Sequence, residues 1–143
     1  MSTQADQATS DLRSAANALR NLNMQIGVPC VVGRALRVNL QFTGDVLIPI
    51  EVARPCILTT FMMGNAAAAA TLFTGSLWTA AGGTGANLST LNRPTAAGLY
   101  RAQQASGFNL ITDSYVYMNL TAGEGSQYLV DAYVFGYYVP MSL

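Results

Sequence analysis

Residues 127–139 read QYLVDAYVFGYYV, and this stretch decides the fold class. Side chains that alternate with a period of two belong to a β-strand whose two faces meet different surroundings. One face carries Val130, Ala132 and Val134, and the other carries Leu129, Tyr133 and Phe135. Because both faces are apolar or aromatic, the pattern predicts one face in the core and a second face that needs cover from another surface.

The preceding apolar segment has the same alternation. Residues 109–120, NLITDSYVYMNL, predict a strand. Its faces carry Val116, Met118 and Leu120 on one side and Tyr115, Tyr117 and Asn119 on the other. The segment TAGEGS at 121–126 joins this strand to residues 127–139 and predicts the loop of a β-hairpin. A hairpin with an aromatic, charge-poor outer face is typical of an interface centre.

Four earlier segments also predict strands: residues 35–42, 46–52, 56–63 and 70–80. In the first of them, the alternation places on one face Leu36, Val38, Leu40 and Phe42. Pro49 indicates an edge strand or a bulge, and Gly75 indicates a break or a bulge. Short strands with turns about every 8–12 residues predict a mainly β protein, with an antiparallel β-sandwich or jelly-roll-like domain over residues 35–143.

The N-terminal residues follow a different period. Residues 3–26 lack Gly and Pro, and their apolar residues recur at alternating spacings of three and four, which predicts an α-helix with a heptad seam. The seam consists of Ala5, Ala8, Leu12, Ala15, Leu19, Leu22 and Ile26. Because GVP at 27–29 ends the helix, we expect a helical arm over residues 1–28 and a linker over residues 29–34. The seam is a candidate for self-association or docking on another protein, and packing on the chain's own β domain is the alternative.

The charge composition of the chain limits the kinds of partner that we expect. Seven acidic and seven basic residues give a formal net charge of +0, and only 10% of the 143 residues are charged. An ordinary soluble domain carries about 25% charged residues, so this composition favours self-association. All seven basic residues are arginines, and they are scattered along the chain rather than gathered in a stripe. We therefore expect no nucleic-acid partner.

The glycine run AAGGTGAN at 80–87 raises the question of a nucleotide site. A P-loop requires a lysine, which the chain lacks, and a dinucleotide fingerprint requires a βαβ unit, which the flanking sequence does not predict. The run therefore predicts a turn between strands. Since the chain also has no histidine, Ser-His-Asp and Cys-His catalysis and the usual zinc sites are excluded. We expect no enzymatic activity, no cofactor and no metal.

Two further features leave alternatives open. Cys30 and Cys56 are compatible with buried thiols, with one disulfide within the chain, or with pairing between chains. No charge occurs between Arg54 and Arg93, a gap long enough to cross a bilayer, but glycines and polar residues dilute its hydropathy. We therefore expect no membrane partner.

Two segments resemble small virion proteins of tailed bacteriophages. GNAAAAATLFTGSLWTAAGGTGANL at 64–88 is similar to their alanine-rich loop, strand and Thr-Ala-Ala-Gly-Gly turn. QYLVDAYVFGYYVP at 127–140 is similar to their closing strand, in which an aspartate, here Asp131, precedes an aromatic and aliphatic run that ends in Gly136 and Tyr137. The similarity covers roughly residues 46–140. It implies a β-sandwich accessory component of the virion, often trimeric, without catalytic residues.

The resemblance implies a non-enzymatic capsid decoration (cement) protein of a phage head. Such a protein is assembled in the host cytoplasm, forms a homotrimer, and contacts the major capsid protein or other virion proteins. The candidate interface aromatics are Trp78, Tyr115, Tyr117, Tyr133 and Tyr137. The alternatives are a neck, head-fibre or tail component, a membrane-disrupting phage protein, and a carbohydrate-binding module in which Trp78, Tyr115 and Tyr117 form a stacking platform.

Overall fold

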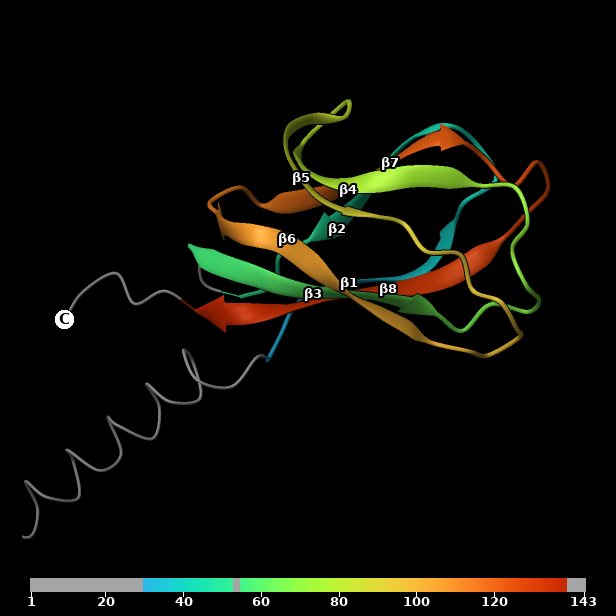
Figure 1. The fold of residues 1–143 in the computed structure, drawn as a ribbon, viewed down its shortest axis with the longest axis horizontal. Helices are drawn as coiled ribbons and strands as arrows, with labels where there is room; N and C mark the ends of the chain where they lie inside the picture. The colour runs from blue at the N-terminus through green and yellow to red at the C-terminus, as the bar shows by residue number, and fades with distance from the viewer. Residues whose placement is uncertain (1–29, 53–54, 139–143) are drawn as a thin grey trace, which may run out of the picture.

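The computed structural model describes residues 30–52 and 55–138, and the arm expected over residues 1–28 lies outside them. The described part contains eight β-strands in two antiparallel sheets of four strands each (Figure 1), which confirms the prediction of a mainly β protein. The strands are β1 (Cys30–Asn39), β2 (Gly44–Pro49), β3 (Cys56–Gly64), β4 (Thr74–Ala80), β5 (Thr84–Thr90), β6 (Arg101–Ile111), β7 (Tyr115–Ala122) and β8 (Leu129–Tyr138).

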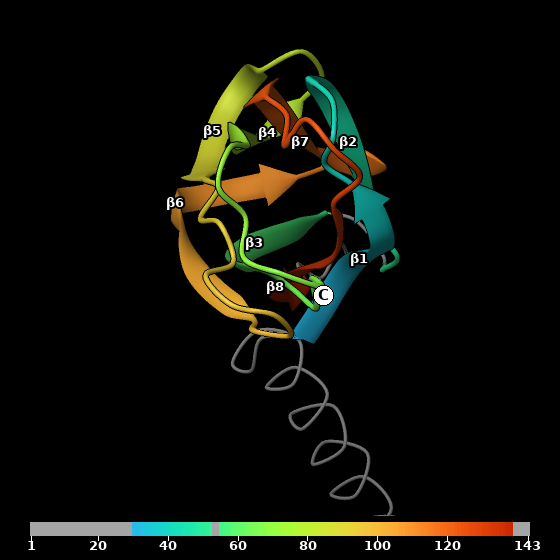
Figure 2. The ribbon, with the colours of Figure 1, turned by 90° about the vertical axis from the view of Figure 1, so that its right-hand side faces the viewer.

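The two sheets lie face to face as two layers (Figure 2). Sheet A has the strand order β1-β8-β3-β6, and sheet B has the order β2-β7-β4-β5. Among the described strands, only β4 and β5 are consecutive in the chain and also neighbours in one sheet; every other connection passes from one sheet to the other. The chain therefore ties the two layers together repeatedly instead of building them one after the other.

The core lies between the layers and receives alternate side chains from both sheets. Phe61 and Val134 of sheet A and Leu77 and Met118 of sheet B have no exposed surface. Fully burying an aliphatic or aromatic side chain of this size stabilises the fold by about 1.5–3 kcal/mol. The predicted alternation of residues 115–120 and 129–135 is confirmed for the face that points into the core. All six residues of that face are buried: Val116, Met118, Leu120, Val130, Ala132 and Val134.

The first strand differs from its prediction. β1 begins at Cys30, inside the segment expected as a linker, and the single apolar face expected over residues 35–42 is wrong. Leu40 is buried, whereas Leu36 is 51% exposed and Phe42 is 70% exposed. Within residues 35–39, the reason is a register shift of β1 against β8 between Ala35 and Val38, a bulge that inserts a residue and so interrupts the period of two. Phe42 lies beyond the end of β1, in the bend that leads to β2.

The predicted hairpin between residues 109–120 and 127–139 is also wrong. Residues 109–120 contain the end of β6 and most of β7, separated by a turn in which the Asp113 carboxylate accepts a hydrogen bond from the Ser114 N–H. β7 lies in sheet B and β8 lies in sheet A, so the TAGEGS segment crosses between the layers. Alternation reports which side of a strand is buried and carries no information on which strand lies beside it, so both arrangements fit the sequence.

The turn expected over residues 80–87 is shorter in the structure, since residues 81–83 connect β4 and β5 and residues 84–87 belong to β5. Gly82 and Gly83 lie between β4 and β5 at φ of 73° and 69°, a region that side chains with a Cβ rarely adopt. Pro49 lies on β2, an edge strand of sheet B, and β4 shifts register at Gly75, so both of these expectations are confirmed. β5 and residues 101–108 of β6 were not predicted as strands, because their small and polar residues show no apolar alternation.

Candidate functional site

The five predicted interface aromatics lie on two opposite surfaces of the molecule. Trp78, Tyr115 and Tyr117 belong to sheet B, whereas Tyr133 and Tyr137 belong to sheet A. All five alternate with buried neighbours and are exposed or half-buried, so they lie on the outer sides of their sheets. The expectation of one continuous aromatic face on a final hairpin is therefore replaced by two separate faces.

The sheet B patch consists of Leu47, Trp78, Tyr115 and Tyr117. Tyr117 pairs with Leu47 of β2 on one side and with Trp78 of β4 on the other, so these three side chains form a row across the sheet. The rings of Tyr115 and Tyr117 lie 6.4 Å apart at 52°, a tilted arrangement that aromatic pairs favour. Leu47 is 45% exposed and Tyr115 is 38% exposed.

Polar groups border the sheet B patch and fix the glycine turn. The Asp45 carboxylate accepts a hydrogen bond from the Asn119 side-chain amide at 2.9 Å and another from the Gly82 N–H at 2.8 Å. A Cβ placed on Gly83 would lie 3.4 Å from Asn119 Oδ1 and 3.8 Å from the Trp78 ring. The glycine run therefore lies at the edge of the patch, and the Gly82 N–H is directed at the protein's own Asp45 carboxylate.

The electrostatic environment of the sheet B patch is acidic. Desolvation raises the pKa of the Tyr117 phenol, and the charges of Asp113 and Asp45 raise it further. Among the described residues, the arginines lie on β1, on β6, or in the segment between β5 and β6, so none belongs to a strand of sheet B. The Tyr117 phenol is therefore held in its neutral form, and the patch favours a neutral or cationic partner surface.

The sheet A patch is defined by five outward apolar side chains at the end of the sheet where β1 begins. They are Val31, Ile57, Leu110, Phe135 and Tyr137. The register places Val31 beside Phe135, and Ile57 between Tyr137 and Leu110, so the patch spans all four strands. Val31 is 42% exposed and Leu110 is 53% exposed, while the other three are half-buried.

The opposite end of the same sheet surface is closed by the chain itself. Asp131 is only 7% exposed, and its carboxylate accepts hydrogen bonds of 2.8 Å from the Arg37 backbone N–H and from the Asn65 side-chain amide. Arg37 and Asn65 both have a positive φ, of 56° and 58°. The ring of Tyr100 lies 6.3 Å from that of Tyr133. Asp131 thus anchors the β1 bulge and the residue that follows β3.

A second carboxylate closes one end of the sandwich. Glu124 accepts hydrogen bonds from the backbone N–H groups of Thr71, Leu72 and Phe73 at 2.9, 3.1 and 3.0 Å, and from the Thr71 hydroxyl. Partial burial raises the pKa of Glu124, but the three backbone donors outweigh it and the net shift is downward. Arg93 donates to the carbonyls of Thr71 and Phe73, so the segment 71–73 is held from two directions.

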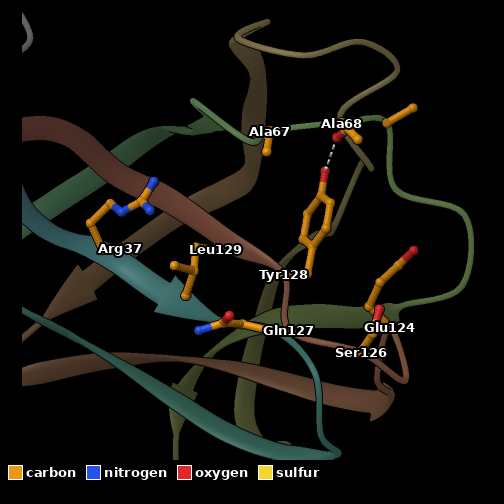
Figure 3. Close-up of a pocket in the computed structure, with 9 residues that line it drawn as sticks. Arg37, Ala67, Ala68, Glu124, Ser126, Gln127, Tyr128 and Leu129 are labelled. Carbon is orange, nitrogen blue, oxygen red and sulfur yellow. Dashed lines mark hydrogen bonds between the residues drawn. The ribbon is translucent and has the colours of Figure 1, made fainter.

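A pocket of about 340 Å³ lies beside this end of the sandwich (Figure 3). It is lined by Arg37, Ala67, Ala68, Ala69, Glu124, Ser126, Gln127, Tyr128 and Leu129. The Tyr128 hydroxyl donates a 2.7 Å hydrogen bond to the Ala68 carbonyl, and burial raises its pKa, with a further contribution from Glu124. Two polar side chains that line the pocket, Tyr128 and Glu124, form hydrogen bonds with the chain's own backbone. These bonds give both residues a role in holding the end of the sandwich together.

The two cysteines are too far apart for a disulfide within the chain. Cys30 is on β1 and Cys56 is on β3, with β8 between them. Two strand spacings amount to about 9.6 Å, beyond the Cα separation that a disulfide permits. Cys56 is buried, and Cys30 is half-buried with its Sγ 3.7 Å from the Gly136 carbonyl.

Some expectations find no counterpart in the described residues. The seam residues from Ala5 to Ile26 all lie outside them. Within the part of the chain that is described, no helix reaches the length and hydropathy needed to cross a membrane, and no three metal-ligating side chains gather. No protein-family model matches the chain, and no curated protein matches its sequence.

Five members of the two patches were not predicted as site residues: Val31, Leu47, Ile57, Leu110 and Phe135. Four of them are aliphatic, and only the cross-strand register brings the five together with the predicted aromatics. A single strand's alternation identifies an outward aliphatic residue, but it does not reveal its neighbours. Without a correct strand order, these side chains read as scattered surface residues.

Proposed function

We propose that the protein is a non-enzymatic structural subunit of a virus particle, a capsid decoration protein that assembles through the outer faces of its β domain. The observation that carries this proposal is that each sheet presents an outward apolar patch, while the carboxylates Asp45, Glu124 and Asp131 are bound to the chain's own donors. A protein of this kind has surface to bury and few side chains left for catalysis.

The topology supports a jelly roll as the finer description of the fold. Sheets ordered β1-β8-β3-β6 and β2-β7-β4-β5 arise when a chain forms two Greek keys and folds the resulting ribbon over itself. Viral capsid proteins and lectins share this architecture. Fold alone does not assign a function, so the assignment rests on the two outward patches.

The mechanism is the removal of apolar surface from water. A specific contact between proteins buries about 800 Å² on each partner, and burial stabilises it by about 25 cal/mol for each Å² of apolar surface before the costs of association are subtracted. A patch such as Leu47, Trp78, Tyr115 and Tyr117 supplies the centre of such a contact. Repetition of the contact over a regular lattice would make the particle more resistant to internal pressure. A homotrimer is the assembly state that the resemblance to phage virion proteins implies.

The test is to locate the chain in an intact particle. Purified particles are examined by mass spectrometry for the protein and by electron cryo-microscopy for its density. The expected result is many copies of an eight-stranded domain at symmetry-related positions on the capsid. Density confined to the neck or tail would assign the alternative virion role, and absence of the protein from the particles would overturn the proposal.

A carbohydrate-binding module is a second candidate, and the composition of the sheet B patch favours it. Aromatic rings in a row across the strands, bordered by the Asp45 carboxylate and the Asn119 amide, combine a stacking surface with hydrogen-bonding groups. Trp78 is the only tryptophan, so its fluorescence reports on this patch alone. Saturable quenching or a spectral shift on titration with neutral oligosaccharides would support this role, and an unchanged spectrum up to millimolar sugar would remove it.

A further inference from the structure

The sheet A patch is open at the point where the N-terminal segment joins the described structure. Cys30 is the first residue of β1 and pairs with Gly136, which lies between Phe135 and Tyr137 of the patch. Val31, the next residue, belongs to the patch itself and is 42% exposed. Cys30, the first described residue, therefore lies at the border of the patch.

The far end of the same surface does not need an added partner. There, the Asp131 carboxylate is bonded to Arg37 and Asn65, and Tyr100 packs beside Tyr133. The near end, from Val31 to Leu110, has no such cover among the described residues. The part of the surface that lacks cover is the part that lies within reach of residues 1–29.

The sequence of that segment contains an apolar face that matches the apolar patch. Leu12, Ala15, Leu19, Leu22 and Ile26 form the larger half of the predicted seam. As a helix, residues 12–26 would be about 22 Å long. The four strands of sheet A are about 14 Å across from the first axis to the last, since neighbouring strands lie about 4.8 Å apart. A helix entering beside β1 is therefore long enough to reach β6, where Leu110 is 53% exposed.

The connection and the charges agree with this placement. Connections of two to six residues between a helix and a strand are common, and GVP at 27–29 provides three. The five patch members are all uncharged, and Arg34, which lies on the β1 edge of the sheet, has its guanidinium 3.4 Å from the Glu51 carboxylate. The seam would thus meet an uncharged surface. A segment tethered beside its site acts at a millimolar effective concentration, which favours the chain's own arm over a neighbour's.

We propose that the seam of residues 12–26 packs across the sheet A patch of its own chain, from β1 to β6. This inference rests on the proposed function and deepens it, because it assigns the arm to sheet A and leaves the sheet B patch as the surface for other subunits. The seam is thereby part of the folded domain rather than a free attachment arm.

Disulfide trapping in the full-length chain tests the placement. In a background with Cys30→Ser and Cys56→Ala, Ala15→Cys is combined with Leu110→Cys at the far edge of the patch. The matched control combines Ala15→Cys with Leu47→Cys, which is 45% exposed on sheet B. Mild oxidation is expected to give a disulfide in a product of monomer mass with Leu110→Cys and none with Leu47→Cys. A product of dimer or trimer mass would place the arm on a neighbouring copy, and no product, or equal yields from both pairs, would also overturn the proposal.

A labelling experiment covers the case in which a double-cysteine variant folds poorly. A single cysteine at Leu110 in the same background is labelled with iodoacetamide, with and without the added changes Leu19→Asp and Leu22→Asp. Release of the arm is expected to raise the labelling rate at least about tenfold, the factor that corresponds to 1.4 kcal/mol of contact free energy. The rate at a cysteine placed at Leu47 is expected to stay constant. An unchanged rate at Leu110 would contradict the proposal, and because both experiments use the isolated chain, that result would leave the particle test of the proposed function unaffected.

Discussion

Asp131 and Phe135 lie on the same strand and on the same outer side of sheet A. The end of the surface at Asp131 is covered by other residues of the chain, whereas the end at Phe135 is not covered by any described residue. At the Asp131 end, it supplies two hydrogen-bond donors to the carboxylate and places Tyr100 beside Tyr133. At the Phe135 end, apolar side chains on four strands have no cover among the described residues. The closed end serves the stability of the domain, and we infer that the open end serves a contact made by the rest of the chain.

The largest expected effect on stability comes from removing the hydrogen bonds of Asp131 at the covered end of sheet A. Asp131→Ala removes both hydrogen bonds, leaves the Arg37 N–H without its acceptor, and leaves two residues with positive φ less supported. A loss of about 3 kcal/mol in the free energy of unfolding is expected, from an unsatisfied buried donor and the loss of bonds to a charged group. Urea denaturation measures it. The control is Asp113→Ala at an exposed turn, expected to cost less than about 0.5 kcal/mol; equal losses would show that the Asp131 anchor is unimportant.

A smaller effect is expected from breaking the contact proposed for the open end. Leu19→Asp combined with Leu22→Asp places two charges in the seam, and full burial of an unpaired charge costs about 3–5 kcal/mol. Because the arm can detach instead, a loss of about 2 kcal/mol or less is expected, with an increase in the binding of a hydrophobic dye. Arg13→Ala combined with Arg20→Ala lies off the seam and should change stability by well under about 1 kcal/mol. If the two double variants behave alike, the heptad interpretation is wrong.

The stabilisation that the Glu124 carboxylate provides is expected to depend on pH. Its pKa is lowered in the folded state from 4.5, so its stabilisation is fully present above pH 4.5 and is lost as the pH falls through the folded value. Since the carboxylate is partly exposed, Glu124→Gln should cost only about 1 kcal/mol at neutral pH. Thermal unfolding of both proteins across the acidic range checks this. A cost that stays constant below pH 4 would contradict an ionised anchor.

Much of the sandwich could be predicted from sequence because burial leaves a local signal. The inward residues Val116, Met118, Val130 and Val134 alternate with outward ones, and Pro49 indicated an edge strand. Which strands pair with one another in each sheet could not be predicted. β7 and β8 are consecutive and both alternate buried with outward side chains, and the short segment between them fits a hairpin as well as a crossing between layers.

The candidate site was only partly predictable for the same reason. Tyr115, Tyr117 and Trp78 do share one patch, because β4 lies beside β7. Tyr133 and Tyr137 lie on the opposite sheet. The role of Asp131 depends on the bulge that brings the Arg37 N–H to its carboxylate, and a bulge in β1 leaves no periodic signal in the sequence.

The central claim is that the outward apolar patch of sheet B is buried against other subunits. Sedimentation velocity of the full-length chain at tens of micromolar, compared with a variant carrying Tyr115→Ser and Tyr117→Ser, tests it most directly. The account predicts an oligomer, with a trimer expected, for the unaltered chain. It predicts a shift toward monomer for the variant, with nearly unchanged thermal stability, because both side chains lie outside the core. A well-behaved monomer for the unaltered chain, or an equally stable oligomer for the variant, would contradict the claim that this face forms the contact.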